Sequence, residues 1–133
     1  MKKPIIAAVD DMFFAAKIRA TAEHLCAEVS FSRNTDALII AARETKPALV
    51  IVDLHAQKFD PFRLAQIIKS DEELRAIKLL GFFSHVQTAL MQQAKEAGFD
   101  FVMPRSAFTN RLAEILEQGM NGDAESETRN AER

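Results

Sequence analysis

The run ALVIVDL (48–54) constrains the fold of this chain more than any other feature. It is apolar at successive positions, which is typical of a parallel strand whose two faces are both covered by helices. Shorter apolar runs recur along the chain. They are separated by longer stretches in which apolar residues repeat at helical spacing. This alternation predicts an α/β domain.

The same pattern predicts the order of the elements. The expected strands lie at 4–9, 28–31, 48–54, 78–83 and 99–103, and the expected helices at 12–26, 35–46, 60–69, 84–98 and 109–119. Thr35 is expected to cap one helix, Pro61 to open the next, and Gly98 to end the fourth. Five alternating strands and helices predict a doubly wound (βα)5 three-layer sandwich with a five-stranded parallel sheet.

Length and composition predict one domain at 1–119, followed by a polar C-terminal tail at 120–133. The net charge of −2 provides no basic field for nucleic acid. No apolar stretch is long enough for a signal-peptide core or a membrane span. The single cysteine excludes an internal disulfide and favours a reducing compartment, so we expect a cytoplasmic protein that binds neither nucleic acid nor membrane.

Charged and polar residues gather where the expected strands end. Asp10 and Asp11 follow the first strand, Asp53 ends the third, Ser84 follows the fourth and Arg105 follows the fifth. In a parallel sheet these ends share one edge, which is where such folds hold their functional groups. Three neighbouring carboxylates repel one another, and Mg²⁺ relieves that repulsion. A carboxylate beside Mg²⁺ can attack a phosphoryl group, so the pattern predicts a magnesium-assisted phosphoaspartate site.

Four segments carry a resemblance to a known family: AAVDD (7–11), LVIVDL (49–54), FDP (59–61) and AGFDFVMPRSAF (97–108). Over residues 4–118 the chain resembles a CheY-like receiver domain of bacterial two-component response regulators, which have a flavodoxin-like fold. The resemblance is to an atypical or pseudo-receiver member.

The resemblance implies roles for particular residues. Asp53 would be the phosphoacceptor. Asp10, Asp11, Asp53 and the backbone carbonyl of His55 would hold Mg²⁺ or Mn²⁺. A histidine kinase or phosphotransfer protein would donate the phosphoryl group, and a downstream protein would be the target. A homodimer through the face formed by helix 86–97, strand 101–103 and helix 109–118 is also implied. Met91, Phe101 and Phe108 are expected to leave apolar surface on that face.

The chain departs from the family pattern at three places. Arg105 occupies the position of the family's lysine, counted seven residues from Gly98. We expect Arg105 to contact phosphate, and to pair with Asp53 before phosphorylation. The next residue, Ser106, replaces a proline, so we expect a trans peptide bond there.

The other two departures are in the switch region. Counting from Asp53 puts Phe83 in the family's hydroxyl position and Ser84 one place further. Either the strand bulges and Ser84 supplies the hydroxyl, or the hydroxyl is absent. Val102 replaces the family's switch aromatic.

Two functions therefore stay open. The first is a single-domain response regulator that accepts phosphate on Asp53 and signals by protein contact. The second is a pseudo-receiver that acts as a phosphorylation-independent interaction module. Neither is an enzyme beyond self-catalysed phosphotransfer and dephosphorylation. A nucleotide- or flavin-binding enzyme is disfavoured, because there is no G-x-G-x-x-G or Walker loop and the chain has four glycines in all.

Overall fold

The computed structural model describes residues 4–84 and 87–118, so the predicted tail and His85 lie outside the described residues. Its strands are β1 Ile5–Ala8, β2 Val29–Phe31, β3 Leu49–Asp53, β4 Lys78–Phe83 and β5 Phe101–Pro104. They form one parallel sheet in the order β2-β1-β3-β4-β5. The reversal of strand order at β1 and β3 is the mark of a doubly wound fold, which confirms the predicted class.

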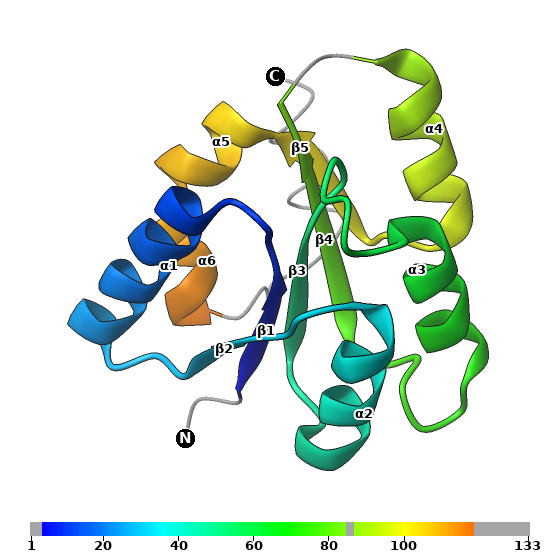
Figure 1. Ribbon diagram of the computed structural model, residues 1–133, viewed down its shortest axis with the longest axis horizontal. Coiled ribbons are helices and arrows are strands. Elements are labelled where there is room, and N and C mark those ends of the chain that lie inside the picture. The colour runs from blue at the N-terminus through cyan, green and yellow to red at the C-terminus, as the bar shows by residue number, and fades with distance from the viewer. Residues whose placement is uncertain (1–3, 85–86, 119–133) are drawn as a thin grey trace.

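The helices are α1 Met12–Leu25, α2 Thr35–Thr45, α3 Pro61–Ser70, α4 Thr88–Ala97, α5 Arg105–Asn110 and α6 Leu112–Gln118. One face of the sheet is covered by α1, α5 and α6, and the other by α2, α3 and α4 (Figure 1). The longest helix, α1, has 14 residues. In the part of the chain that the structure describes, no helix is long and apolar enough to cross a membrane.

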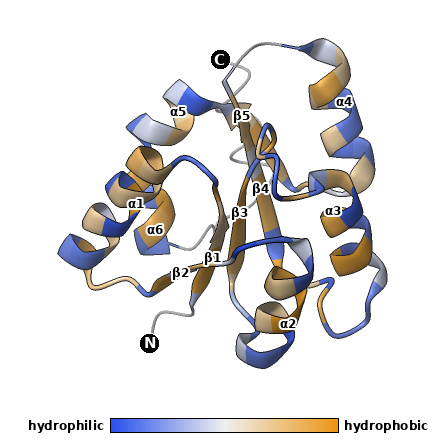
Figure 2. Ribbon diagram, viewed as in Figure 1, coloured by the Kyte–Doolittle hydropathy of each residue, from blue (hydrophilic) through white to orange (hydrophobic). Residues whose placement is uncertain are grey.

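The sheet separates two hydrophobic clusters. Val50 and Val52 of β3 belong to the cluster on the α2–α4 side, and Leu49 and Ile51 to the cluster on the α1–α6 side. All five residues of β3 are buried, as the run ALVIVDL predicts. Figure 2 shows the same division, with apolar strands between helices that carry both apolar and polar residues.

Two of the three predicted helix signals are confirmed. Pro61 lies in the first turn of α3, and Gly98 ends α4 in the left-handed conformation with φ of 119°. The prediction for Thr35 is wrong, because Asn34 caps α2 and accepts a hydrogen bond from the Ala37 amide at 2.8 Å. Thr35 is buried instead, and its hydroxyl accepts a hydrogen bond from the Asp60 amide at 2.9 Å.

The C-terminal helical region differs most from expectation. The predicted helix at 109–119 is two helices, and the first begins at Arg105 directly after β5. Pro104 is the last residue of β5 and the N-cap of α5, with φ of −64°. Proline is tolerated there because β5 is an edge strand. The segment after Pro104 contains no helix breaker, so the helix starts four residues earlier than predicted.

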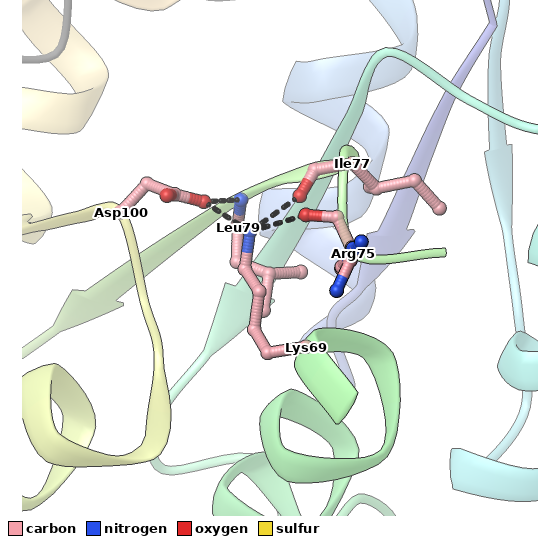
Figure 3. A network of polar contacts seen from close by, with 5 residues as sticks. All are labelled: Lys69, Arg75, Ile77, Leu79 and Asp100. Carbon is pink, nitrogen blue, oxygen red and sulfur yellow. Dashed lines mark hydrogen bonds and ion pairs between the residues drawn. The ribbon is translucent and has the colours of Figure 1, made fainter. Parts of the chain in front are cut away.

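A polar network fastens the amino-terminal end of β4 (Figure 3). The Lys69 ammonium donates hydrogen bonds to the carbonyls of Arg75 and Ile77, at 3.2 and 2.8 Å, and to the Asp100 carboxylate at 2.9 Å. The same Asp100 oxygen accepts the Leu79 amide at 2.8 Å. All three Lys69 donors are therefore used, and α3 is tied to β4 and to the turn before β5.

Candidate functional site

The predicted acids meet at one edge of the sheet. Asp10 and Asp11 follow β1, and Asp53 ends β3, the strand beside it. In Figure 1 this edge is at the top, where the strands run into α1, α3 and α5. The topology therefore places all three carboxyl-bearing residues at neighbouring strand ends.

Asp53 is a buried acid, with 8% of its surface exposed. Its Oδ1 accepts a hydrogen bond from the His55 amide at 2.9 Å. Burial raises the pKa of the Asp53 carboxyl above its ordinary value, and the His55 amide opposes this by lowering it. The neighbouring Asp10 raises the pKa further, while Arg105 lowers it. Burial therefore destabilises the charged form of the Asp53 carboxyl. A cation bound nearby would stabilise that form.

Asp10 secures the loop between β3 and α3. Its Oδ2 accepts hydrogen bonds from the amides of Gln57 at 2.7 Å and Lys58 at 3.2 Å. Its Oδ1 is buried and has no hydrogen-bond partner among the described residues. An unsatisfied carboxylate oxygen at this position suits a cation or a proton donor.

Both oxygens of Asp11 are engaged. Oδ1 caps α1 by accepting the amides of Phe13 and Phe14, at 2.9 and 3.1 Å. Oδ2 is 3.4 Å from Nη2 of Arg105, in an ion pair that joins α1 to α5. The Phe14 amide and the Arg105 guanidinium both lower the pKa of the Asp11 carboxyl, so it is charged.

Arg105 lies at this edge, as the match to the lysine position predicts, but its ion pair is with Asp11 rather than Asp53. The guanidinium also lies over the Phe14 ring, 4.0 Å from the centroid. There are no cis peptide bonds between described residues, so the bond to Ser106 is trans as expected. Phe14 was not predicted to be part of this site. Its place three residues after the capping Asp11 was the available signal.

The other predicted residues surround the site without joining it. Ser84 is exposed just beyond β4, with no side-chain hydrogen bond to the acids. Phe83 is buried in the cluster on the α2–α4 side, and Val102 packs against that cluster. The ladder pairs Asp53 with Phe82 and Phe83 with Pro104. A hydroxyl role for Ser84 stays a prediction.

Metal binding at this edge can be tested against these contacts. The Asp10 oxygen without a partner and the buried Asp53 fit a hard divalent cation. Asp11 is not available as a metal ligand while its Oδ2 is paired with Arg105. Within residues 4–84 and 87–118, no group of three or more His, Cys, Asp or Glu side chains is placed to hold a metal ion. The fit is therefore partial.

A cavity of about 480 Å³ opens beside Asp10. It lies between the end of β1, the β2–α2 connection and the β3–α3 loop, and is lined by Val9, Asp10, Ser32, Arg33, Asn34 and Lys58. Neither Asp53 nor Arg105 is among the residues that line it.

No protein-family model and no curated protein matches this chain. Solved structures do match it. The signal receiver domain of a DNA-binding response regulator from Colwellia psychrerythraea 34H has a TM-score of 0.78 and 19% identity, over 91% of this chain and 100% of that one. The chemotaxis response regulator CheY4 of Vibrio cholerae has a TM-score of 0.76 and 13% identity, over 89% and 98%.

A third match is the Mn²⁺-bound form of the response regulator Rcp1. It has a TM-score of 0.70 and 16% identity, over 89% of this chain and 93% of that one. Because the identities are this low, the likeness establishes the backbone architecture alone. That architecture agrees with the resemblance seen in the sequence. The chain has the fold of response-regulator receiver domains.

Proposed function

We propose that this chain is a receiver that accepts a phosphoryl group on Asp53 and signals by protein contact. The observation that carries the proposal is the placement of Asp53. It ends the fully buried strand β3 at the acid edge, and one oxygen is oriented by the His55 amide. A carboxylate held in this way is positioned to attack, which is most of what phosphoryl transfer requires of a protein.

In the proposed reaction, a carboxylate oxygen of Asp53 forms a bond to the phosphorus of a phosphohistidine donor. The bond from phosphorus to the donor's imidazole breaks, and its electron pair stays with the imidazole. Asp10, Asp53 and the His55 carbonyl would hold Mg²⁺ or Mn²⁺, joined by Asp11 once it leaves Arg105. The bound ion would neutralise charge on the phosphoryl oxygens. Arg105 would take up charge on the transferred group once it leaves Asp11.

The partners in this proposal are a histidine kinase or phosphotransfer protein and a downstream protein target. A cytoplasmic location is part of the proposal, and the free cysteine Cys26 is compatible with it. Catalysis would be limited to self-phosphorylation and dephosphorylation.

The test is phosphorylation by acetyl phosphate with Mg²⁺, followed by intact-mass measurement. Wild type should gain one phosphate and Asp53→Asn none. Asp60→Asn is the matched control, because Asp60 is an exposed helix cap in the loop after β3 and asparagine caps equally well. A phosphate gained by Asp53→Asn would show that another residue is the phosphoacceptor.

The alternative function is a pseudo-receiver that binds partners without phosphorylation. The Arg105–Asp11 ion pair favours it, because that contact withdraws one acid from the site. Wild type that stays unmodified under conditions that label an ordinary receiver would establish this alternative.

A further inference from the structure

The start of α1 presents two groups to Arg105 from one helical turn. Asp11 offers a carboxylate oxygen and Phe14 offers a ring face. The other Asp11 oxygen caps the helix, so the carboxylate cannot rotate freely. Phe14 is itself fixed, because its ring packs on those of Phe82 and Phe108 at centroid distances of 5.2 and 5.8 Å. The two groups form a rigid receptor for a planar cation.

The backbone that carries Arg105 is equally constrained. Pro104 pairs with Phe83 in the sheet, and its ring fixes the backbone angle just before Arg105. The guanidinium is a planar fork that can stack on a ring while its edge meets a carboxylate. A lysine ammonium at the same position has no flat surface to stack. The chemistry of arginine therefore matches this receptor.

We propose that Arg105 is an internal cation that competes with a divalent metal ion for Asp11. In the closed arrangement the guanidinium lies on Phe14 and neutralises Asp11. In the open arrangement Arg105 leaves, and Asp11 joins Asp10 and Asp53 as a metal ligand. The inference rests on the proposed function only in taking these three acids as the ligand set.

Two observations support competition over a merely structural ion pair. Asp10 keeps a buried oxygen with no partner among the described residues, so neutralisation of the acids is incomplete in the closed arrangement. The Arg105 side chain is 35% exposed, and that of Asp11 41%. Ion pairs this accessible are weak enough to be displaced by a divalent ion.

The experiment measures binding of Mg²⁺ and Mn²⁺ to the full chain. Because the chain has no Trp or Tyr, calorimetry suits Mg²⁺, and the electron paramagnetic resonance signal of free Mn²⁺ suits Mn²⁺. Arg105→Gln should bind metal roughly two- to fivefold more tightly than wild type, the range expected for loss of an accessible competing ion pair. Phe14→Leu should also tighten binding, although it changes no charge.

Two further variants separate competition from the general effect of removing a positive charge. Lys58→Gln removes a cation that lines the cavity beside Asp10 but has no ion pair with Asp11. It should tighten binding less than Arg105→Gln. In an Asp11→Asn background, Arg105→Gln should add no more than Lys58→Gln does, because the contested ligand is gone.

Equal gains from Arg105→Gln and Lys58→Gln, with Phe14→Leu unchanged, would overturn the inference. Absence of metal binding in every variant would also overturn it. If Phe14→Leu does not fold by circular dichroism, the cycle of Arg105 and Asp11 variants decides alone. The proposed function is judged separately by phosphate on Asp53. If Arg105→Gln binds metal more tightly but Asp53 of wild type gains no phosphate, the proposed function is wrong and this inference stands. If Asp53 gains phosphate but Arg105→Gln binds metal no more tightly than wild type, this inference is wrong.

Discussion

Asp53 carries a charge in surroundings that disfavour it. Burial raises the pKa of its carboxyl in the folded state, so its contribution favours folding below the unfolded pKa of about 3.8 and is lost as the pH rises through the folded pKa. At neutral pH the charged form therefore opposes folding. Asp53→Asn removes the charge and keeps an oxygen that can accept the His55 amide.

We predict that Asp53→Asn increases the free energy of unfolding at about pH 7, and that the increase shrinks towards about pH 4. Urea unfolding across this range measures it. Asp36→Asn is the control, since the Asp36 side chain is 81% exposed and is expected to change stability little at either pH. A less stable Asp53→Asn at neutral pH would show that the native charge is compensated.

Arg105 is predicted to act on the phosphorylated form as well as on the metal site. A guanidinium binds phosphoryl oxygens in a two-pronged way, which a lysine ammonium cannot do. Arg105→Lys keeps the charge but loses the two-pronged contact. It should shorten the lifetime of phospho-Asp53 by roughly two- to fivefold, the equivalent of one modest hydrogen bond.

Arg105→Ala should shorten that lifetime further. Decay of the phosphorylated mass after removal of acetyl phosphate measures all three proteins. Identical decay in wild type and both variants would mean that Arg105 does not reach the phosphoryl group.

At the scale of the elements, one lysine joins a helix to two connecting segments. Lys69 is in the last turn of α3, and its hydrogen bonds reach the segment that leads into β4 and the turn between α4 and β5 (Figure 3). The ion pair with Asp100 is well covered, with side-chain exposures of 21% and 22%. A Cβ on Gly98 would come within 2.7 Å of the Lys69 Cγ, so the lysine stem also fills the space beside that glycine.

We predict that Lys69→Met lowers the free energy of unfolding by about 2–3 kcal/mol, because it leaves a partly buried carboxylate and two carbonyls short of a charged donor. Lys95→Met is the matched control, since Lys95 is an exposed lysine in α4 that makes no ion pair with any described residue. Denaturant unfolding compares the two. An equal decrease in the free energy of unfolding in both variants would show that the Lys69 network does not stabilise the fold.

At the scale of the whole molecule, exposed apolar side chains lie away from the predicted dimer face. Phe101 and Phe108 are buried, so the apolar surface expected there from these residues is absent. Met91 packs against the core cluster. A homodimer through α4, β5 and the segment 109–118, which is mainly α6, stays a prediction, and Phe101 and Phe108 provide no apolar surface for it. The large exposed apolar residues of the described chain are Met12, Phe13 and Ile40, at 83%, 90% and 59%.

Met12 and Phe13 directly follow the acid pair, so a protein that delivers phosphate to Asp53 would meet them. We predict that Phe13→Ser slows transfer from a histidine-phosphorylated protein donor at least roughly fivefold, the equivalent of a modest interface contact. Transfer from acetyl phosphate should be unchanged. Ile40→Ser, on α2, is the control. If Phe13→Ser slows phosphoryl transfer equally from both donors, Phe13 affects the reaction at Asp53 and not the binding of the protein donor.

Local sequence patterns predicted most of the fold, because burial on two faces and helical periodicity are written in consecutive residues. ALVIVDL specified a covered strand, and Pro61 and Gly98 marked helix ends that the structure confirms. The parallel topology then placed the acids Asp10, Asp11 and Asp53 at one edge without any knowledge of side-chain positions.

Only the tertiary structure decided which groups touch. Arg105 pairs with Asp11 and stacks on Phe14, and Lys69 meets Asp100 across 31 positions of the chain. Such choices depend on side-chain rotamers and on separations of a few ångströms between different elements. Periodicity and spacing carry no information at that scale, because they fix where a residue stands in its own element and not which side chain faces it from another.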